Sequence, residues 1–182
     1  MNTGIISARY ARALLAYAME QGAEDAVYDS MKSLVRTLHE VKEFPVILRN
    51  PGLRPSERVD LICSVMEPLS VIRRFVRLVV KMERVEMLIF IAYEYISLYR
   101  ERKGVYAVRF ITALPLDDNA RSAVERLLEC KEAKRIEVEY VVDESIIGGF
   151  RMEASSRRVD ASVEGQLRRI RKEILRTNRK LV

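Results

Sequence analysis

Hydrophobic residues recur at helical spacing, three and four positions apart, as far as Lys103. This period predicts six helices, which Gly and Pro residues separate from one another. The expected helices begin near Thr3, Glu24, Phe44, Pro55, Ser70 and Val85. Connections this short between helices are typical of a compact helical bundle.

The first of these helices is apolar on two sides. Tyr10, Leu14 and Tyr17 belong to one side, and Ala11 and Leu15 belong to the other. Such a helix is either buried on both sides, or packed on its own core while it offers the second side to a partner. The residues themselves leave both alternatives open.

After Gly104 the period of the apolar residues changes from helical to alternating. Val105–Ala113 and Arg135–Val142 alternate as strands do. Between them, Asp117 or Asp118 is expected to cap a helix. One or two further strands and a last helix are expected to complete this part of the chain.

Together these patterns predict an α+β fold that is mainly α. We expect a six-helix bundle over residues 1–103 and a small α/β domain over residues 104–182. A chain of 182 residues is long enough for each of these domains to bury a core.

The stretch Val142–Ile174 holds the most specific motif of the chain. An apolar segment carries Gly148 and Gly149 in its middle, and Phe150 follows them. No third glycine and no Gly-Lys-Ser sequence accompanies the pair, so a phosphate-binding loop is not indicated. We expect these glycines to allow close backbone packing between a strand and its neighbours.

Asp160 and Ser162 are expected to begin the last helix, because short polar side chains favour helix starts. The apolar residues of this helix recur at i, i+4, i+7 and i+11, which places them on one face. They are Val163, Leu167, Ile170 and Ile174. We expect this face to pack on the small domain and close it.

Charge is unevenly distributed along the chain. The net charge is +6, and residues 151–182 carry all of this excess, with 10 basic and 4 acidic residues. The partner of this segment is therefore expected to be acidic. The expected fifth helix also has a basic side, which favours a solvated surface or a protein contact. That side consists of Arg73, Arg74, Arg77 and Lys81.

Catalytic and metal-binding chemistry is not indicated by the residue pattern. His39 is the single histidine, which leaves little material for a catalytic triad. Cys63 and Cys130 lie far apart without a Cys-x-x-Cys partner, so a zinc site is not expected. No apolar run is long enough to cross a membrane. We expect a protein without catalytic site, metal or cofactor.

Motifs at both ends of the chain resemble one family, the delta subunit of F-type ATP synthases, called the oligomycin-sensitivity-conferring protein in mitochondria. The resemblance covers essentially the whole chain in the right order. Its motifs lie at residues 8–14, 48–51, 75–84, 104–116, 142–150, 159–163 and 166–167. The segment 154–158 departs from many relatives, which have a glycine-containing turn there, and the basic C-terminal segment is more positive than the family would suggest.

The resemblance implies a non-catalytic stator subunit, one copy per complex, at the cytoplasmic face of the bacterial inner membrane. The helical domain would grip the N-terminal tail of an alpha subunit, and the C-terminal domain would hold the b-subunit stalk. The family's tail-binding groove lies between its first and fifth helices. Carried onto this chain, its candidate contact residues are Tyr10, Ala13, Leu14, Tyr17, Phe75, Leu78, Val79 and Met82.

A second class of function also fits the composition. A small RNA- or ribosome-associated protein could use the basic C-terminal helix to contact phosphates. Phosphate contacts predict an affinity that falls steeply with salt, whereas an apolar groove should tolerate salt.

Overall fold

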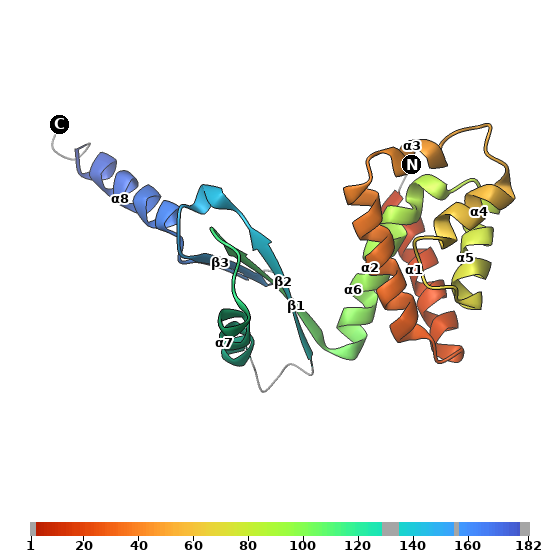
Figure 1. Ribbon diagram of the computed structural model, residues 1–182, viewed down its shortest axis with the longest axis horizontal. Coiled ribbons are helices and arrows are strands. Elements are labelled where there is room, and N and C mark those ends of the chain that lie inside the picture. The colour runs from red at the N-terminus through yellow and green to blue at the C-terminus, as the bar shows by residue number, and fades with distance from the viewer. Residues whose placement is uncertain (1–2, 129–134, 155–156, 179–182) are drawn as a thin grey trace. The chain divides into compact units, whose positions relative to one another are not determined.

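The structure is a computed structural model that describes residues 3–128, 135–154 and 157–178. Figure 1 shows the arrangement of its elements. The chain divides into two compact units, residues 1–102 and 103–182. The first unit is helical and the second combines helices with a four-stranded sheet, which confirms the predicted fold class.

The first unit contains six α-helices and one short 3-10 helix in its described residues. They are α1 (Thr3–Glu20), α2 (Glu24–Glu40), α3 (Glu43–Leu48), α4 (Pro55–Cys63), α5 (Ser70–Lys81), η1 (Val85–Met87) and α6 (Leu88–Lys103). Gly22, at φ +62°, forms the turn that ends α1 and leads into α2, because glycine adopts this left-handed conformation at little cost. Pro55 occupies the first turn of α4, where its missing N–H is no loss.

The core of this unit consists of side chains from all six helices. Tyr95 and Tyr99 on α6 tie that helix to the start of α2: the Tyr95 hydroxyl donates to the Glu24 carbonyl at 3.1 Å, and the Tyr99 hydroxyl donates to Asp25 at 2.7 Å. Burial raises the pKa of Tyr95, so its hydroxyl keeps the proton that it donates. The long α6 is thereby fixed against α2 by polar contacts as well as by packing.

The second unit is a small layered α+β fold. Its elements are β1 (Val105–Thr112), α7 (Asp118–Leu128), β2 (Arg135–Val142), η2 (Glu144–Ile146), β3 (Phe150–Ala154), β4 (Arg157–Asp160) and α8 (Val163–Asn178). The strand order is β2-β1-β3-β4. Strands β1 and β2 run parallel, and the other two pairings are antiparallel.

The two faces of the sheet differ in chemistry. On one face Phe110 stacks on Phe150 with ring centroids 5.0 Å apart, and its ring meets Tyr140 edge-on. The Tyr140 hydroxyl donates to the Arg121 carbonyl, which places α7 over this aromatic face. The opposite face carries cross-strand ion pairs, among them Arg109–Glu139 at 3.3 Å. Helix α7 therefore lies against the aromatic face of the sheet, although none of its own described side chains is fully buried.

The last helix does not close this layer, and that expectation from the sequence is wrong. Val163, Leu167, Ile170 and Ile174 are all exposed, Leu167 to 54%. Figure 1 shows α8 extending away from the sheet beyond its first turn. The aromatic face of the sheet is already occupied by α7, so α8 is attached only through its N-terminus. Leu127 on α7 is exposed as well.

Candidate protein-binding surfaces

Two rows of side chains run along α1 and α5 and together form a surface that we call the α1–α5 face. Helix α1 contributes Tyr10, Ala13 and Tyr17, and α5 with its C-cap contributes Leu78 and Met82. Ala13 is exposed, both tyrosines are half-buried, and the Leu78 and Met82 side chains are 45% and 49% exposed. An apolar strip with this degree of exposure can bury further area against a partner.

Three of the eight predicted contact residues lie beneath this face. Leu14, Phe75 and Val79 are buried in the bundle, and Val79 has no exposed surface at all. The ring of Tyr10 packs edge-on against the ring of Phe75, with the ring centroids 6.4 Å apart, so a side chain of the face contacts the core directly. We therefore assign these three side chains to the core below the α1–α5 face. A substitution such as Val79→Asp would disturb folding before it reported on binding.

An arginine stands over each of the two tyrosines. The Arg84 guanidinium lies 5.4 Å from the centre of the Tyr10 ring and donates to its hydroxyl at 2.7 Å. The Arg74 guanidinium lies 5.4 Å from the Tyr17 ring and donates to its hydroxyl at 3.3 Å. Arg74 precedes Leu78 by one helical turn and Arg84 follows Met82. The two arginine–tyrosine pairs thus bracket the apolar strip.

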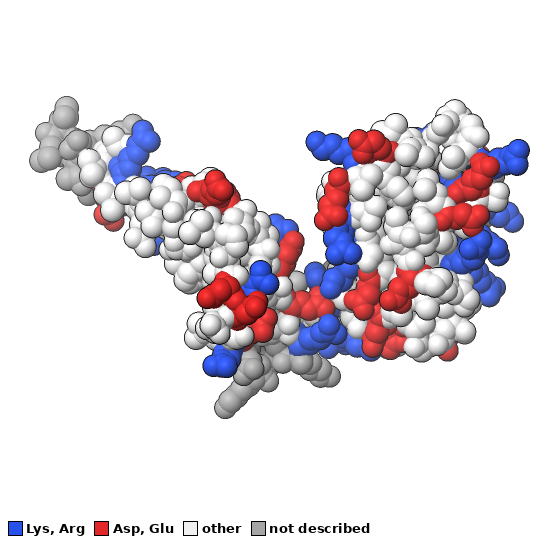
Figure 2. Space-filling model, viewed as in Figure 1, with Lys and Arg blue, Asp and Glu red and all other residues white. Residues whose placement is uncertain are grey.

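The second candidate surface is the exposed row on α8. Its four members, Val163, Leu167, Ile170 and Ile174, are spaced four, three and four residues apart, which is the a/d spacing of a coiled coil. Leu175 is equally exposed but lies beside this row. Basic residues flank it, and Figure 2 shows Lys and Arg along one edge of α8. A narrow seam of this kind fits a single helix better than a broad surface.

The start of α8 is held by a dense set of polar contacts. The Ser162 backbone N–H and hydroxyl both donate to Asp160 Oδ1, at 3.1 and 2.5 Å, and the Ser162 oxygen accepts from the Gly165 N–H at 3.0 Å. These bonds, followed by the nearby Arg151, hold the pKa of Asp160 below its ordinary value. Ser162 therefore caps the first turn of α8, whereas Asp160 is the last residue of β4 and orients this cap.

Gly149 is the glycine on which this junction depends. It has φ +74°, and a Cβ built on it would lie 2.4 Å from the Ala161 carbonyl oxygen. A Cβ on Gly148 would make only an ordinary contact with Val163, at 3.4 Å. The predicted close backbone approach is thus found at Gly149, between the start of β3 and the start of α8.

Arg151 links the sheet to α8. Its side chain is nearly buried, and its Nη2 lies 3.2 Å from Glu164 Oε2, which also receives Arg168 at 2.9 Å. Its Nε lies 3.5 Å from Asp160 Oδ2, close enough for an ion pair but not aligned for a hydrogen bond. The first turn of α8 is therefore fixed on β3, while the rest of the helix is left for other contacts.

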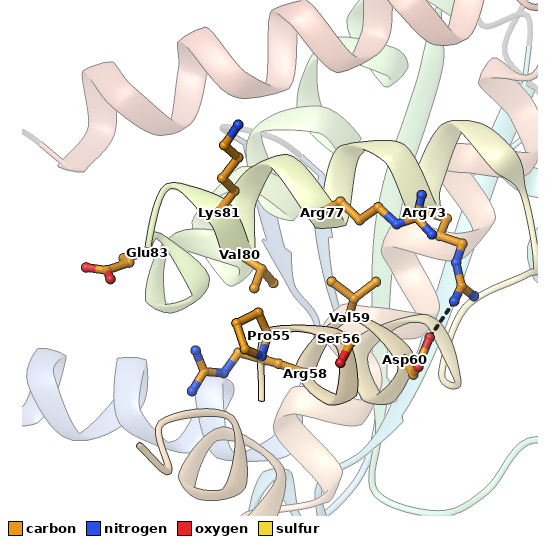
Figure 3. Close-up of a pocket in the computed structure, with 10 residues that line it drawn as sticks. All are labelled: Pro55, Ser56, Arg58, Val59, Asp60, Arg73, Arg77, Val80, Lys81 and Glu83. Carbon is orange, nitrogen blue, oxygen red and sulfur yellow. Dashed lines mark hydrogen bonds and ion pairs between the residues drawn. The ribbon is translucent and has the colours of Figure 1, made fainter. Parts of the chain in front are cut away.

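A cleft of about 460 Å³ lies between α4 and α5 (Figure 3). Pro55, Val59 and Val80 face its centre, whereas Arg58 and Lys81 point away from it. Arg73 is engaged by Asp60 at 2.5 Å. The charged groups around the cleft do not converge on one point, as the recognition of a small anionic ligand would require.

Titratable groups give no sign of catalysis in the part of the chain that the structure describes. His39 is exposed, and its Nε2 lies 2.5 Å from the Tyr93 hydroxyl, an arrangement suited to joining α2 and α6. Within the described ranges, no group of three or more His, Cys, Asp or Glu side chains could hold a metal ion. Nor is any helix there long and apolar enough to cross a membrane.

Comparison with known proteins places the two surfaces in context. The family model described as ATP synthase delta (OSCP) subunit matches residues 6–174. The chain belongs to this family. It is 37% identical to ATP synthase subunit delta of Bacteroides fragilis, over the full length of both chains. It is 38% identical to the Parabacteroides distasonis subunit, over 96% of this chain and 98% of that one.

The fold is shared as well. A chain in the cryo-EM structure of the Toxoplasma gondii mitochondrial ATP synthase hexamer superimposes with a TM-score of 0.68, at 19% identity, over 93% of this chain and 97% of that chain. ATP synthase delta subunits are structural stator subunits rather than catalytic ones, so this chain is a non-catalytic, peripheral-stalk component of a membrane-associated complex. The alternative of an RNA- or ribosome-associated protein is set aside.

Residue patterns did not predict the two arginine–tyrosine pairs or the Arg151 contacts. Arg74 was expected only as part of a basic helix side, and nothing local links Arg84 to Tyr10. The signal that was available is compositional: α1 and α5 together hold six basic residues and one acidic residue, Glu20. Unbalanced charge beside an apolar row could have pointed to a partner-facing edge.

Proposed function

We propose that this subunit joins two helical partners, one on each of its compact units. The α1–α5 face would hold the N-terminal tail of an alpha subunit, and the seam on α8 would hold the end of the b-subunit stalk. A link of this kind keeps the catalytic head from turning with the rotor, so that torque is used for ATP synthesis. One copy per complex, peripheral to the cytoplasmic face of the bacterial inner membrane, fits this role.

The observation that carries the proposal is the presence of an exposed apolar row on each unit of a stator subunit. Each row is arranged along helices, and each is narrow enough for one amphipathic helix. Burial of such rows contributes about 25 cal/mol per Å² of apolar surface removed from water. Neither surface converges polar groups as a small-molecule site would, which favours peptide helices as ligands.

The alpha-tail contact can be tested by calorimetric titration of the full-length chain with a peptide that copies the N-terminal tail of the same organism's alpha subunit. Leu78→Asp and Met82→Asp should each weaken binding at least about tenfold, because a charge would be buried in the contact. Tyr10→Ala and Ala13→Asp should weaken it as well. Circular dichroism should show the fold intact, since Ala13, Leu78 and Met82 are exposed and Tyr10 is only half-buried.

Phe90→Asp is the matched control for this experiment. Phe90 is 51% exposed, close to Leu78 and Met82, but it belongs to α6, one turn before Tyr93, which contacts His39 of α2. It should leave the affinity unchanged. The alpha-tail assignment fails if the wild-type chain does not bind at tens of micromolar. The face itself is wrong if Phe90→Asp weakens binding as much as Leu78→Asp.

A further inference from the structure

The two arginine–tyrosine pairs at the ends of the α1–α5 face keep hydrogen-bond donors that their mutual contact does not use. Arg84 uses Nη1 on the Tyr10 hydroxyl, and Arg74 uses the same atom on Tyr17. A guanidinium has five N–H groups, so most of its donors remain. Each tyrosine oxygen accepts from its arginine, which leaves the hydroxyl hydrogen able to donate. Each pair can therefore offer O–H and N–H donors to the same acceptor.

Within the described residues, no carboxylate neutralises Arg74 or Arg84. Among the residues that the structure describes, no carboxylate lies within ion-pair distance of Arg74 or Arg84, while the neighbouring Arg73 is paired with Asp60. The tyrosine rings hold the guanidinium groups by cation–π contact, which limits the side-chain freedom that a binding partner would otherwise have to restrict. These groups are positioned charges that no carboxylate of the described residues balances.

The surroundings strengthen the positive potential at this face. Helices α1 and α5 carry Arg9, Arg12, Arg73, Arg74, Arg77 and Lys81 against the single acid Glu20. Figure 2 shows Lys and Arg gathered along the edge of the bundle by α4 and α5. An incoming helix with acidic edges would be steered to this face and would be favoured over a neutral or basic one.

We infer that the helix that docks on the α1–α5 face carries two carboxylates about two turns apart, one for the Arg84–Tyr10 pair and one for the Arg74–Tyr17 pair. Tyr10 and Tyr17 are seven residues apart on α1, which is about 10 Å along the axis. A partner helix lying along α1 matches that separation with acids at i and i+7. Its apolar side then meets Ala13, Leu78 and Met82.

This spacing would fix the position of the partner helix along α1 in addition to contributing to its affinity. Apolar contacts alone would let a helix slide by one turn at small cost, because one apolar row resembles another. Two charge-assisted contacts at fixed separation penalise such a shift, since a displaced helix would satisfy at most one of them. The inference rests on the proposed role of the face as a helix-binding surface, and it adds the chemistry of the ligand.

The test uses designed peptides, so that it does not depend on the alpha tail. Three helical peptides share one apolar stripe. The first carries Glu at i and i+7 beside that stripe, the second carries Gln at both positions, and the third carries the same two Glu residues at i and i+4. At low salt the first should bind the full-length chain about tenfold or more tightly than the second. The third should bind with intermediate affinity.

Variants of the chain locate the effect. Arg74→Gln and Arg84→Gln should each reduce the affinity of the i, i+7 peptide about three- to tenfold, and the loss should shrink as salt is raised. Tyr10→Phe and Tyr17→Phe should each produce a smaller loss, because only the O–H donor is removed. Arg77→Gln is the matched control: Arg77 lies on α5 but lines the α4–α5 cleft, so its removal lowers only the general positive potential, and the affinity should fall much less than with Arg74→Gln.

The outcomes separate this inference from the proposed function. Equal affinity of the Glu and Gln peptides, no binding by either, or an Arg77→Gln loss as large as that of Arg74→Gln would overturn the inference. An alpha-tail peptide that binds without any response to Arg74→Gln and Arg84→Gln would also overturn it, and the proposed partner would stand. If the designed peptides obey the charge rule but the alpha tail does not bind, the partner assignment fails and the inference holds.

Discussion

Helices α5 and α8 have apolar rows of similar regularity, but the row on α5 is buried and the row on α8 is exposed. On α5 the row of Val71, Ile72, Phe75, Val76, Val79 and Val80 is buried within the bundle. On α8 the row of Val163, Leu167, Ile170 and Ile174 is exposed along its whole length. The period of a sequence reports that a helix has a side to be covered. The period does not report whether that side packs against the same chain or against another chain.

The difference follows from what each helix can reach. Helix α5 lies among α1, α4 and the other helices of its unit, and connections of six residues or fewer join consecutive α-helices there. Helix α8 comes last, after α7 has taken the aromatic side of a sheet that has only four strands. The opposite side of that sheet carries ion pairs such as Arg109–Glu139. An uncovered apolar row in a stator subunit then suits a contact between chains.

The largest expected effect is on the buried side of this comparison. Val79→Asp should destabilise the bundle by about 3–5 kcal/mol or unfold it, because it places an unpaired carboxylate where no water reaches. Val79→Ala, which removes methyl groups without adding charge, should cost about 2 kcal/mol. Denaturant unfolding of the full-length chain measures both. A Val79→Asp protein as stable as the wild type would remove Val79 from the core.

The junction that carries α8 provides the next effect. Gly149→Ala should cost about 1–3 kcal/mol, since the new methyl group would meet the Ala161 carbonyl oxygen and the residue has a positive φ. Gly148→Ala is the matched control and should cause no loss, because its Cβ has ordinary space. Amide hydrogen exchange in β3 and α8 would report the change locally. Equal behaviour of the two variants would contradict the close approach at Gly149.

The sequence predicted most of the secondary structure because its signals are local. The expected start of the first helix, near Thr3, and the expected bounds of the strand Arg135–Val142 agree with α1 and β2. Pro55 and the acidic pair Glu24 and Asp25 mark helix starts through their own backbone and charge preferences. Signals of this kind need no knowledge of the rest of the chain.

The candidate surfaces were less predictable because they depend on distant residues. Arg74 meets Tyr17 across 57 positions of sequence, and Arg84 meets Tyr10 across 74. No local pattern pairs these residues. Burial is just as non-local: Val79 and Leu78 are neighbours in an apolar helix, yet one is core and the other is surface. Eight contact candidates were chosen by family resemblance, and the structure separates the five at the face from the three beneath it.

A smaller effect is expected from Asp160, and it should depend on pH. The pKa of Asp160 is held below its ordinary value by the Ser162 hydrogen bonds and Arg151, so its charge stabilises the folded C-terminal unit. This contribution is complete above the ordinary pKa, about 3.9, and is lost as the pH falls through the lower, folded value. Asp160→Asn should therefore lower the Tm at neutral pH, and the difference from wild type should narrow in acid.

Glu139→Gln serves as the comparison for that pH series. Glu139 pairs with Arg109 on the exposed charged face of the sheet, where both side chains are largely solvated. Its removal should change stability by less than about 1 kcal/mol. Calorimetric scans of the wild type and both variants between neutral and acidic pH measure these differences in Tm. If the Tm difference between wild type and Asp160→Asn grew in acid, the pH dependence would be opposite to the prediction. The Asp160 charge would then not stabilise the folded unit.

The smallest effect on stability is expected at the centre of the exposed row. Leu167→Asp should change the free energy of unfolding by less than about 0.5 kcal/mol, because the side chain already faces water. The same substitution should strongly weaken binding of a peptide that copies the C-terminal end of the b subunit, since a charge would enter the seam. Leu175→Asp, equally exposed but beside the row, should affect neither property. A large fall in Tm with Leu167→Asp would mean that α8 does pack on its own unit, and the contrast with α5 would disappear.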